Sequence, residues 1–511
     1  MRTEKAIKNV ISSMASYFVL TILGFIVQSV LKHSLGAEYL GISGLFTNII
    51  SGLSVIELGF GSAIIVNMYK PVAENDTDMI VSLLQFYKKI YVIISAIVLV
   101  VGLAIVPFVD VIIGETTVPI PTKAFFLLYL FDVIASYLLT YKRSVLYANQ
   151  KTYYITWIHM FAVVVTNIVQ IIFLLTLKNY FLYLITSIVL RVIENIVINI
   201  LIDKAYPYVK HKEIIPLKQE VKDDIKKKVS GLFFHKISTF LVYGTDNIII
   251  SMVPGLGIIM VGIYSSYSMI TTKLTALIDS IFNSVTAGVG NLLIEDDKEK
   301  SYRMFKNIQF MNGWIYIFFS IAFYYISFPF VEVWMGKDFV LDAPTVLVIA
   351  VGLFIAGMRA SFGIFKNAAG IFYEDRFIPI IEAGVNLVTS IPLALMLGLK
   401  GVLIGTMCSN LLLYIYSYRK YVYGTIFGKN TVTYCKDLLK YVLYYIIAFI
   451  STAAVQQFIN FESIWMQLVM VLVVSAIVPN AVIVLLNYRT EEFRYVWGIV
   501  CKVIPLDRFK R

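Results

Sequence analysis

The chain has 511 residues, of which 59% are hydrophobic and 15% charged; its mean hydropathy is +0.81 and its formal charge +11. Soluble globular chains are about 45–50% apolar and about 25% charged, so the composition excludes a soluble protein and exceeds what one anchor helix would add. The three cysteines, Cys408, Cys435 and Cys501, are scattered and only four histidines occur. We therefore expect no disulfide framework, no metal site and no bound cofactor.

Fourteen segments are long and apolar enough to cross a bilayer core, which takes about 20 residues of helix. The first is too long for a signal peptide and lacks a small-residue cleavage site, so it is predicted to be a transmembrane helix. In chain order the predicted spans are 11–32, 41–67, 88–109, 122–146, 153–177, 179–202, 229–253, 257–284, 306–328, 343–365, 377–398, 400–418, 437–458 and 464–487.

The basic residues predict how these spans are oriented. If both termini lie in the cytoplasm, most of the 43 Lys and Arg residues fall in cytoplasmic loops and tails, as the positive-inside rule requires. The exceptions are five in outside loops (Lys32, Lys123, Lys178, Lys337 and Lys400) and four within spans (Arg191, Lys236, Lys273 and Arg359). The positive charge is thus interpreted as a topology signal, and no nucleic-acid partner is expected.

The longest loop is basic and separates six spans from the next six. LGAEYLGI at 35–42 is repeated as LGIIMVGI at 256–263, and at nearly the same offset Arg143 aligns with Arg359. Parallel repeats of this kind are typical of transporters that bind substrate between two halves. We predict an all-α polytopic fold of fourteen transmembrane helices, with two pseudo-symmetric six-helix lobes around a central cavity and two extra C-terminal helices. The predicted boundaries are 1–203 and 229–420 for the lobes, 204–228 for a cytoplasmic linker, and 421–511 for spans 13 and 14 with the tail.

Three spans carry polar stripes at helical spacing. Hydrogen bonds between packed helices explain some such stripes, but an ionised group in hydrocarbon costs at least about 3 kcal/mol, which favours a hydrated cavity. The stripes are Ser43, Thr47, Ser51 and Ser54 in the second span; Lys236, Thr239, Tyr243 and Asn247 in the seventh; and Tyr264, Ser268, Thr271, Thr275 and Asp279 in the eighth.

Charges inside the spans are the candidates for a binding site. Lys236 and Arg359 are predicted to line the cavity, whereas Lys273 points away from the stripe of its own helix. Arg191 and Glu194 are three residues apart and are predicted to pair with each other, and His159 is interpreted as a packed polar residue. Five acids are either proton or cation sites or counter-ions to these bases: Glu57, Asp132, Asp246, Asp279 and Glu382.

The segment IELGFGSAIIVNMYKPVAENDTDMI at 56–80, with the span count, the repeat and the basic linker, resembles the Wzx-type oligosaccharide flippases of the multidrug/oligosaccharidyl-lipid/polysaccharide (MOP) exporter superfamily. The resemblance implies alternating access in the bacterial cytoplasmic membrane, moving undecaprenyl-diphosphate-linked repeat units outward for capsular, exopolysaccharide or O-antigen-like polymers. It also implies basic cavity residues for the diphosphate, Na⁺ or H⁺ coupling, and a polysaccharide polymerase and chain-length proteins as partners. By position, Lys236 and Arg359 fit the basic role, followed by Lys273 and Arg143; Tyr243, Tyr264, Tyr267 and Ser268 suit the sugars.

Two other transport functions remain open, and a membrane enzyme is disfavoured. A lipid II or teichoic-acid precursor flippase differs only in the head group that it carries. A cation-coupled drug exporter with a MATE-like fold is disfavoured by the basic residues within the spans. The outside loops are too short for the catalytic domain of a polymerase or glycosyltransferase, so we expect no enzyme activity.

Overall fold

The computed structural model describes residues 2–55, 57, 60–114, 116–117, 121–210, 216–283, 285–295, 297–371, 374–375 and 377–503. These residues are helical apart from turns and short connections, and they form two compact units, Met1–Ser265 and Ser266–Arg511. The predicted all-α, multi-pass fold class is confirmed. The lobe and linker boundaries drawn from the sequence remain predictions.

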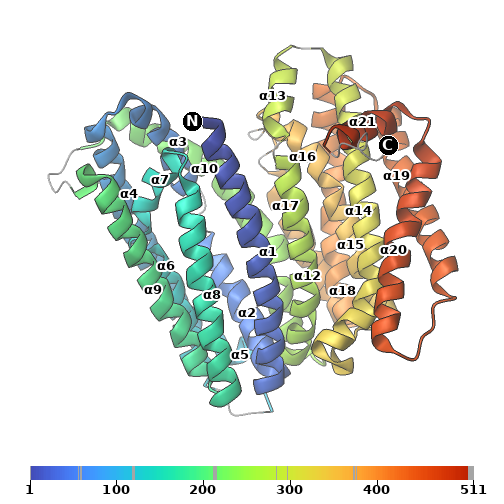
Figure 1. Ribbon diagram of the computed structural model, residues 1–511, viewed down its shortest axis with the longest axis horizontal. Helices are drawn as coiled ribbons and strands as arrows, with labels where there is room; N and C mark the ends of the chain where they lie inside the picture. Colours follow the sequence, from blue (N-terminus) through green and yellow to red (C-terminus); the bar gives the residue numbers. More distant parts are fainter. Residues whose placement is uncertain are drawn as a thin grey trace, which may run out of the picture. The chain divides into compact units, whose positions relative to one another are not determined.

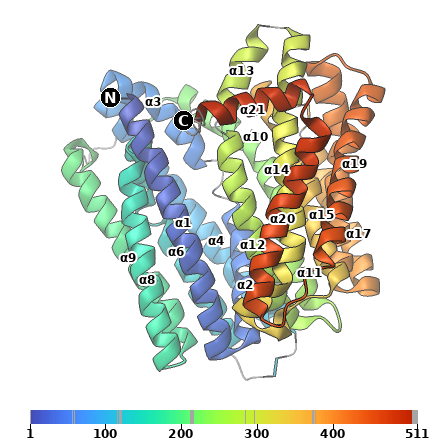
Figure 2. The ribbon, with the colours of Figure 1, turned by 45° about the vertical axis from the view of Figure 1, so that its right-hand side comes forward.

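The first unit holds the helices up to the start of α12. They are α1 (Arg2–Leu35), α2 (Ala37–Ser54), α3 (Phe60–Glu74), α4 (Thr77–Ile105), η1 (Val106–Phe108), α5 (Val109–Ile113), α6 (Thr122–Tyr137), η2 (Thr140–Lys142), α7 (Arg143–Ala148), α8 (Thr152–Thr176), α9 (Tyr180–Ala205), η3 (Pro207–Lys210), α10 (Gln219–Tyr243), α11 (Asp246–Met252) and α12 (Gly257–Asn283), which continues into the second unit. Within this unit α1 runs alongside α8 (Figures 1 and 2).

The second unit continues to the end of the chain. It contains α13 (Thr286–Ile294), α14 (Lys298–Met335), η4 (Lys337–Phe339), α15 (Ala343–Gly357), α16 (Arg359–Ala368), α17 (Ile378–Leu397), α18 (Leu399–Leu413), the π-helix η5 (Tyr414–Ile426), α19 (Thr431–Gln456), α20 (Ile464–Asn487) and α21 (Glu491–Val503). Here α20 lies against α14, as Figure 2 shows.

Local sequence accounts for many of the helix ends. The side chains of Asp76, Asn179 and Asn430 each accept a hydrogen bond from a backbone N–H in the first turn of the helix that follows, at 2.9, 3.1 and 2.9 Å. Such caps satisfy donors that a helix start leaves unpaired. Gly36 and Gly336 end α1 and α14 with φ of 97°, a left-handed conformation that favours glycine.

Eleven helical segments of the described part are long and apolar enough to cross a membrane. The three predicted spans that do not meet this test are 41–67, 229–253 and 257–284. The first is divided between α2 and α3, and the second between α10 and α11. The third forms one helix, α12, but its polar stripe lowers its mean hydropathy. These are the three spans that carry the polar stripes, so fourteen membrane helices remain compatible with the structure.

The predicted linker, 204–228, packs against the first unit through apolar side chains. Leu217, Ile225 and Val229 are buried in the same core as Met68 of α3 and Leu83 of α4. Helix α10 runs without a break from the linker into the predicted seventh span. The basic segment is therefore fixed to the first unit by apolar contacts.

Candidate functional site

Each of two spans has an arginine close to an irregular point in its helix. In the fourth span, Leu138 is extended and Leu139 is left-handed (φ 68°), and after a short turn α7 begins at Arg143. This break exposes backbone groups within the span, which neighbouring side chains must stabilise. In the tenth span, α15 ends at Gly357 and α16 begins at Arg359, but Met358 between them is helical and its N–H donates to the Phe354 carbonyl at 3.0 Å, so the helix continues.

Arg143 has a buried carboxylate as its partner. Its Nη2 atom donates to Glu194 Oε1 (2.9 Å) and Asn195 Oδ1 (2.6 Å), both on α9. His159 Nδ1 of α8 lies 3.2 Å from the same carboxylate. The side chains of Arg143 and Glu194 are 16% and 5% exposed, so the charge of Arg143 is compensated within the first unit.

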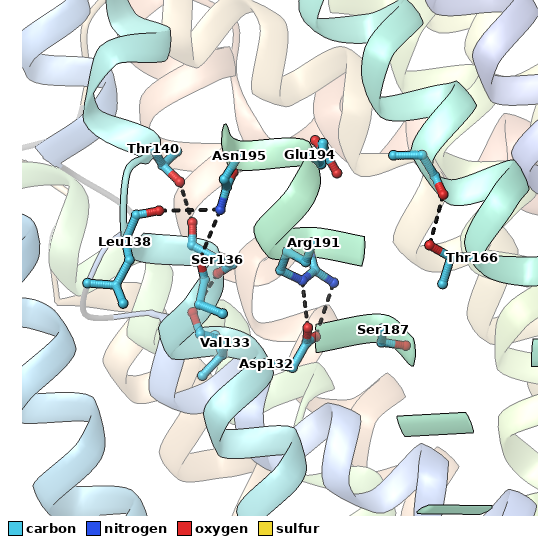
Figure 3. A network of polar contacts seen from close by, with 12 residues as sticks. Asp132, Val133, Ser136, Leu138, Thr140, Thr166, Ser187, Arg191, Glu194 and Asn195 are labelled. Atoms are coloured by element: carbon cyan, nitrogen blue, oxygen red, sulfur yellow. Dashed lines mark hydrogen bonds and ion pairs between the residues drawn. The ribbon is translucent and has the colours of Figure 1, made fainter. Parts of the chain in front are cut away.

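Arg191 pairs with Asp132 and not with Glu194, so the pairing predicted from sequence spacing is wrong. Its Nε and Nη2 atoms donate to the two carboxylate oxygens of Asp132 at 2.7 and 3.1 Å (Figure 3). Neighbouring helices decide this pairing, because Arg191 faces α6 while Glu194 meets α7 and α8. Asn195 supports the nearby break by donating to the carbonyls of Ala135 (2.9 Å) and Leu138 (3.3 Å).

Arg359 occupies a similar environment in the second unit. Its Nη1 atom donates to Glu382 Oε1 of α17 (2.7 Å) and to Asn410 Oδ1 of α18. Its Nε atom donates to the Tyr418 hydroxyl of η5 at 3.3 Å. The side chains of Arg359 and Glu382 are 21% and 6% exposed.

The two arginine clusters are built from the same parts. Each has an arginine close to an irregular point in its span, a buried glutamate and an asparagine. Arg143 and Arg359 are also the residues that the sequence repeat aligns. Because both guanidinium groups already have carboxylate partners, an anionic ligand would have to compete with these partners for either one.

Glu57 lies in a polar cavity of the first unit. The Tyr87 hydroxyl donates to the Tyr91 hydroxyl (2.8 Å), which in turn donates to Glu57 Oε1. A Cβ atom at Gly61 would lie 2.9 Å from the Tyr87 hydroxyl and 3.3 Å from Glu57 Oε1, so glycine leaves room for these groups. The cavity has a volume of about 260 Å³ and is lined by Glu57, Gly61, Ile65, Tyr87, Tyr91, Thr140, Arg143, Ser144 and Tyr147.

The exposed surfaces of the helices fall into two kinds. Helices α8 and α9 expose large apolar side chains such as Phe161, Ile168 and Ile200, as expected of surfaces that face lipid. Helix α2 exposes Thr47 and Ser51 and has no exposed large hydrophobic side chain among its described residues. On the other polar-striped helices, Thr239 and Tyr243 are exposed on α10, and Thr272 and Ser280 on α12, which also exposes Ile259 and Ile281.

Asp246 is part of a buried polar contact between helices. The Tyr264 hydroxyl of α12 donates to Asp246 Oδ2 of α11 at 3.4 Å. The next residue, Asn247, donates to the Gly44 carbonyl (3.4 Å) and to Ser265 Oγ (3.3 Å). Asp246 and Asn247 are both buried and Tyr264 is half-buried, so this part of the predicted stripe holds helices together.

Helices α2 and α12 cross where the sequence repeat matches. A Cβ atom at Gly41 would lie 2.0 Å from the Ile258 carbonyl oxygen, and one at Gly262 would lie 2.8 Å from the Ala37 carbonyl oxygen. Gly41 and Gly262 are equivalent positions of LGAEYLGI and LGIIMVGI, and they approach each other at this crossing.

The remaining predicted site residues are less fully defined. Lys236 belongs to α10, but its side chain lies outside the described part of the structure. Lys273, Ser268 and Asp279 of α12 are half-buried. Ser268 accepts a hydrogen bond through its backbone carbonyl from Thr271 at 3.1 Å.

Two features were not predicted from the sequence. Lys366 of α16 forms an ion pair with the fully buried Asp375, which also accepts from Ser417 Oγ at 2.8 Å. The chain of hydroxyls from Tyr87 to Glu57 was also missed, although two tyrosines four residues apart in an apolar span are a visible signal. No helical spacing points to the Lys366–Asp375 pair, because Asp375 lies in the connection that follows α16 and its position depends on how the chain turns there.

Comparison with known proteins identifies the fold. No protein-family model matches the chain, and no curated protein matches it. The structure is similar to that of the lipid II flippase MurJ in an inward closed conformation (TM-score 0.66, 16% identity, covering 93% of this chain and 98% of that one). It is also similar to an inward-facing multidrug resistance MATE family transporter of the MOP superfamily (0.58, 15%, 77% and 91%) and to a MATE transporter of Vibrio cholerae (0.56, 16%, 84% and 99%). At these identities the likeness establishes the fold alone, that of MOP superfamily transporters.

Proposed function

We propose that the protein is a flippase that moves undecaprenyl-diphosphate-linked oligosaccharide repeat units from the inner to the outer leaflet of a bacterial cytoplasmic membrane. It works by alternating access, has both termini in the cytoplasm and serves the synthesis of a surface polysaccharide. A polymerase and chain-length proteins would act on the product.

The contrast between its two kinds of exposed surface carries this proposal. Helices α8 and α9 expose apolar side chains, whereas α2 exposes threonine and serine. Polar side chains exposed along a membrane helix indicate contact with water. A lipid-linked glycan needs both environments, because its prenyl chain dissolves in lipid while its diphosphate and sugars require hydration. The MOP transporter fold supports the same conclusion.

The ion pairs change which basic residue we propose to bind the diphosphate. A diphosphate needs cations where water is scarce. Arg143 and Arg359 already form ion pairs with buried glutamates. We therefore assign the leading diphosphate-binding role to Lys236, with Arg359, Lys273 and Arg143 behind it. Asp132 and Glu382 are assigned as counter-ions of Arg191 and Arg359.

An export assay tests the proposal directly. We expect Lys236→Ala to abolish export of the polymer in the native host, with a normal amount of protein in the membrane. Lys226→Ala is the matched control, since this exposed lysine lies on the same helix in the linker. Normal export by Lys236→Ala would remove Lys236 from the mechanism, and normal polymer in a deletion strain would overturn the proposed function.

A lipid II flippase is the second candidate, and the similarity to MurJ favours it. Its substrate carries the same kind of undecaprenyl diphosphate and differs in the sugars and peptide attached. Rescue of cells depleted of their own lipid II flippase would support this candidate. Efflux of cationic drugs that depends on the gene would instead support a MATE-like exporter.

A further inference from the structure

The cavity beside Glu57 combines groups that suit a particular part of the substrate. Its volume of about 260 Å³ lies just below the range of about 300–1,000 Å³ that holds drug-sized ligands. It therefore has room for one small ring, with the rest of a glycan outside it. Tyr147 is exposed (36%), which leaves that side of the cavity open, whereas Tyr87 and Tyr91 are buried.

The walls offer both hydrogen-bond acceptors and a donor. Glu57 presents a carboxylate of which Tyr91 bonds one oxygen. The hydroxyls of Thr140 and Ser144 donate to the carbonyls of Ser136 and Tyr141, so their oxygens keep accepting capacity. The Nε atom of Arg143 is a buried donor with no hydrogen-bond partner among the residues that the structure describes.

The charge of the cavity selects against anions. The guanidinium of Arg143 is compensated by Glu194 at 2.9 Å, whereas the hydrogen-bond partner of Glu57 is a neutral phenol. With Glu194 counted beside Arg143, the described charged groups in and around the cavity are two carboxylates and one guanidinium. A diphosphate or an acidic sugar would meet a like charge at this position, which is unfavourable where water is scarce.

We infer that this cavity binds one pyranose ring of the transported glycan, and that Glu57 makes it selective for a neutral or amino sugar over an acidic one. The inference rests on the proposed function and adds a sugar subsite to it. Glu57 accepts hydrogen bonds from ring hydroxyl or amino groups, and the tyrosines provide faces for the apolar side of the ring. The diphosphate is then held elsewhere, by Lys236, Arg359 or Lys273, and not by Arg143, which lines this cavity.

Binding to the purified full-length protein in nanodiscs tests the inference. The probes are undecaprenyl diphosphate alone and the same lipid bearing a single N-acetylglucosamine or a single glucuronic acid. We expect the wild-type protein to bind the N-acetylglucosamine lipid more tightly than the bare lipid, and the glucuronic acid lipid less tightly than the N-acetylglucosamine lipid. Glu57→Gln should weaken binding of the N-acetylglucosamine lipid about tenfold, the effect of one charge-assisted hydrogen bond, and should leave the bare lipid unaffected.

Two further variants serve as a control and as an independent test of the cavity. Glu38→Gln is the matched control, because Glu38 is a buried glutamate in the first turn of α2, where it accepts from Thr117 (2.9 and 2.6 Å) outside the cavity. Its binding should resemble that of the wild type. Tyr91→Phe removes one hydroxyl from the cavity and tests the site independently if Glu57→Gln does not fold.

Each outcome has a clear meaning. Equal loss of both lipids in Glu57→Gln, or no loss of either in both cavity variants, overturns the sugar subsite while leaving the flippase proposal intact. Loss of Na⁺ or pH dependence with an unchanged preference for sugar also overturns it, in favour of ion coupling at Glu57. A wild-type protein that binds none of the three lipids overturns the proposed function and the subsite with it.

Discussion

At the scale of residues, three arginines within the membrane spans have carboxylate partners on neighbouring helices. Arg143, Arg191 and Arg359 each meet a carboxylate on another helix at 2.9 Å or less. Desolvating two charges is costly, and a buried pair is worth keeping only when both partners are present. Loss of one partner therefore costs more than loss of an exposed ion pair.

The cost of leaving a buried charge without its partner predicts how Arg359→Ala affects stability. Arg359→Ala should leave Glu382 buried without its partner and lower the free energy of unfolding by about 3–5 kcal/mol. The double variant Arg359→Met with Glu382→Met should recover most of this loss, because no uncompensated charge remains. The measurement is thermal unfolding of the purified protein, followed by intrinsic fluorescence.

The exposed pair Lys400–Asp342, at 3.3 Å, provides the comparison. Lys400→Ala should cost less than about 1 kcal/mol, since solvent screens exposed pairs. If Arg359→Ala and Lys400→Ala had equal effects, the Arg359–Glu382 pair would have no structural role.

At the scale of elements, the broken and crossing helices distinguish this chain from a plain helical bundle. The break of the fourth span places Arg143 at the start of the half-helix that follows it. Helices α2 and α12 approach closely because glycines stand at their crossing. Small residues are the means by which membrane helices come close together.

The crossing predicts an effect of one added methyl group. Gly41→Ala would place a Cβ atom 2.0 Å from the Ile258 carbonyl oxygen, so α2 and α12 would have to separate. We expect most of this variant to be lost from the monodisperse peak in fluorescence-detected size-exclusion chromatography. Gly384→Ala is the control, because a Cβ atom there has no neighbour within 4 Å. A normal peak for Gly41→Ala would show that the crossing tolerates a wider spacing.

At the scale of the whole molecule, the chain presents two kinds of surface. Apolar side chains exposed on α8 and α9 suit the hydrocarbon of the bilayer, and the polar side chains exposed on α2 and α10 suit water. The proposed transport of a lipid-linked glycan would depend on this difference, because a charged head group requires a hydrated path.

Cysteine accessibility distinguishes the two surfaces. In a background with Cys408, Cys435 and Cys501 changed to serine, Thr47→Cys should react with a water-soluble maleimide, since thiolates form and react in water. Ile168→Cys, on the apolar face of α8, should react at least tenfold more slowly although its side chain is also exposed. Equal labelling of both positions would contradict a hydrated face on α2.

The sequence by itself determined the all-α multi-pass fold and the position of most spans. Long apolar segments leave no other stable arrangement in lipid, where every backbone polar group must be satisfied within its own helix. The sequence repeat also aligns Arg143 with Arg359, and the two arginines have similar surroundings in the structure.

Only the tertiary structure decided which charges meet. Arg191 pairs with Asp132 and not with the nearby Glu194, and Glu57 meets Tyr91, which the sequence pattern did not suggest. Such pairs depend on which helices are neighbours and on how each is rotated about its own axis. Spacing along one helix gives the face on which a residue lies, but the group that this face meets is decided by packing between helices.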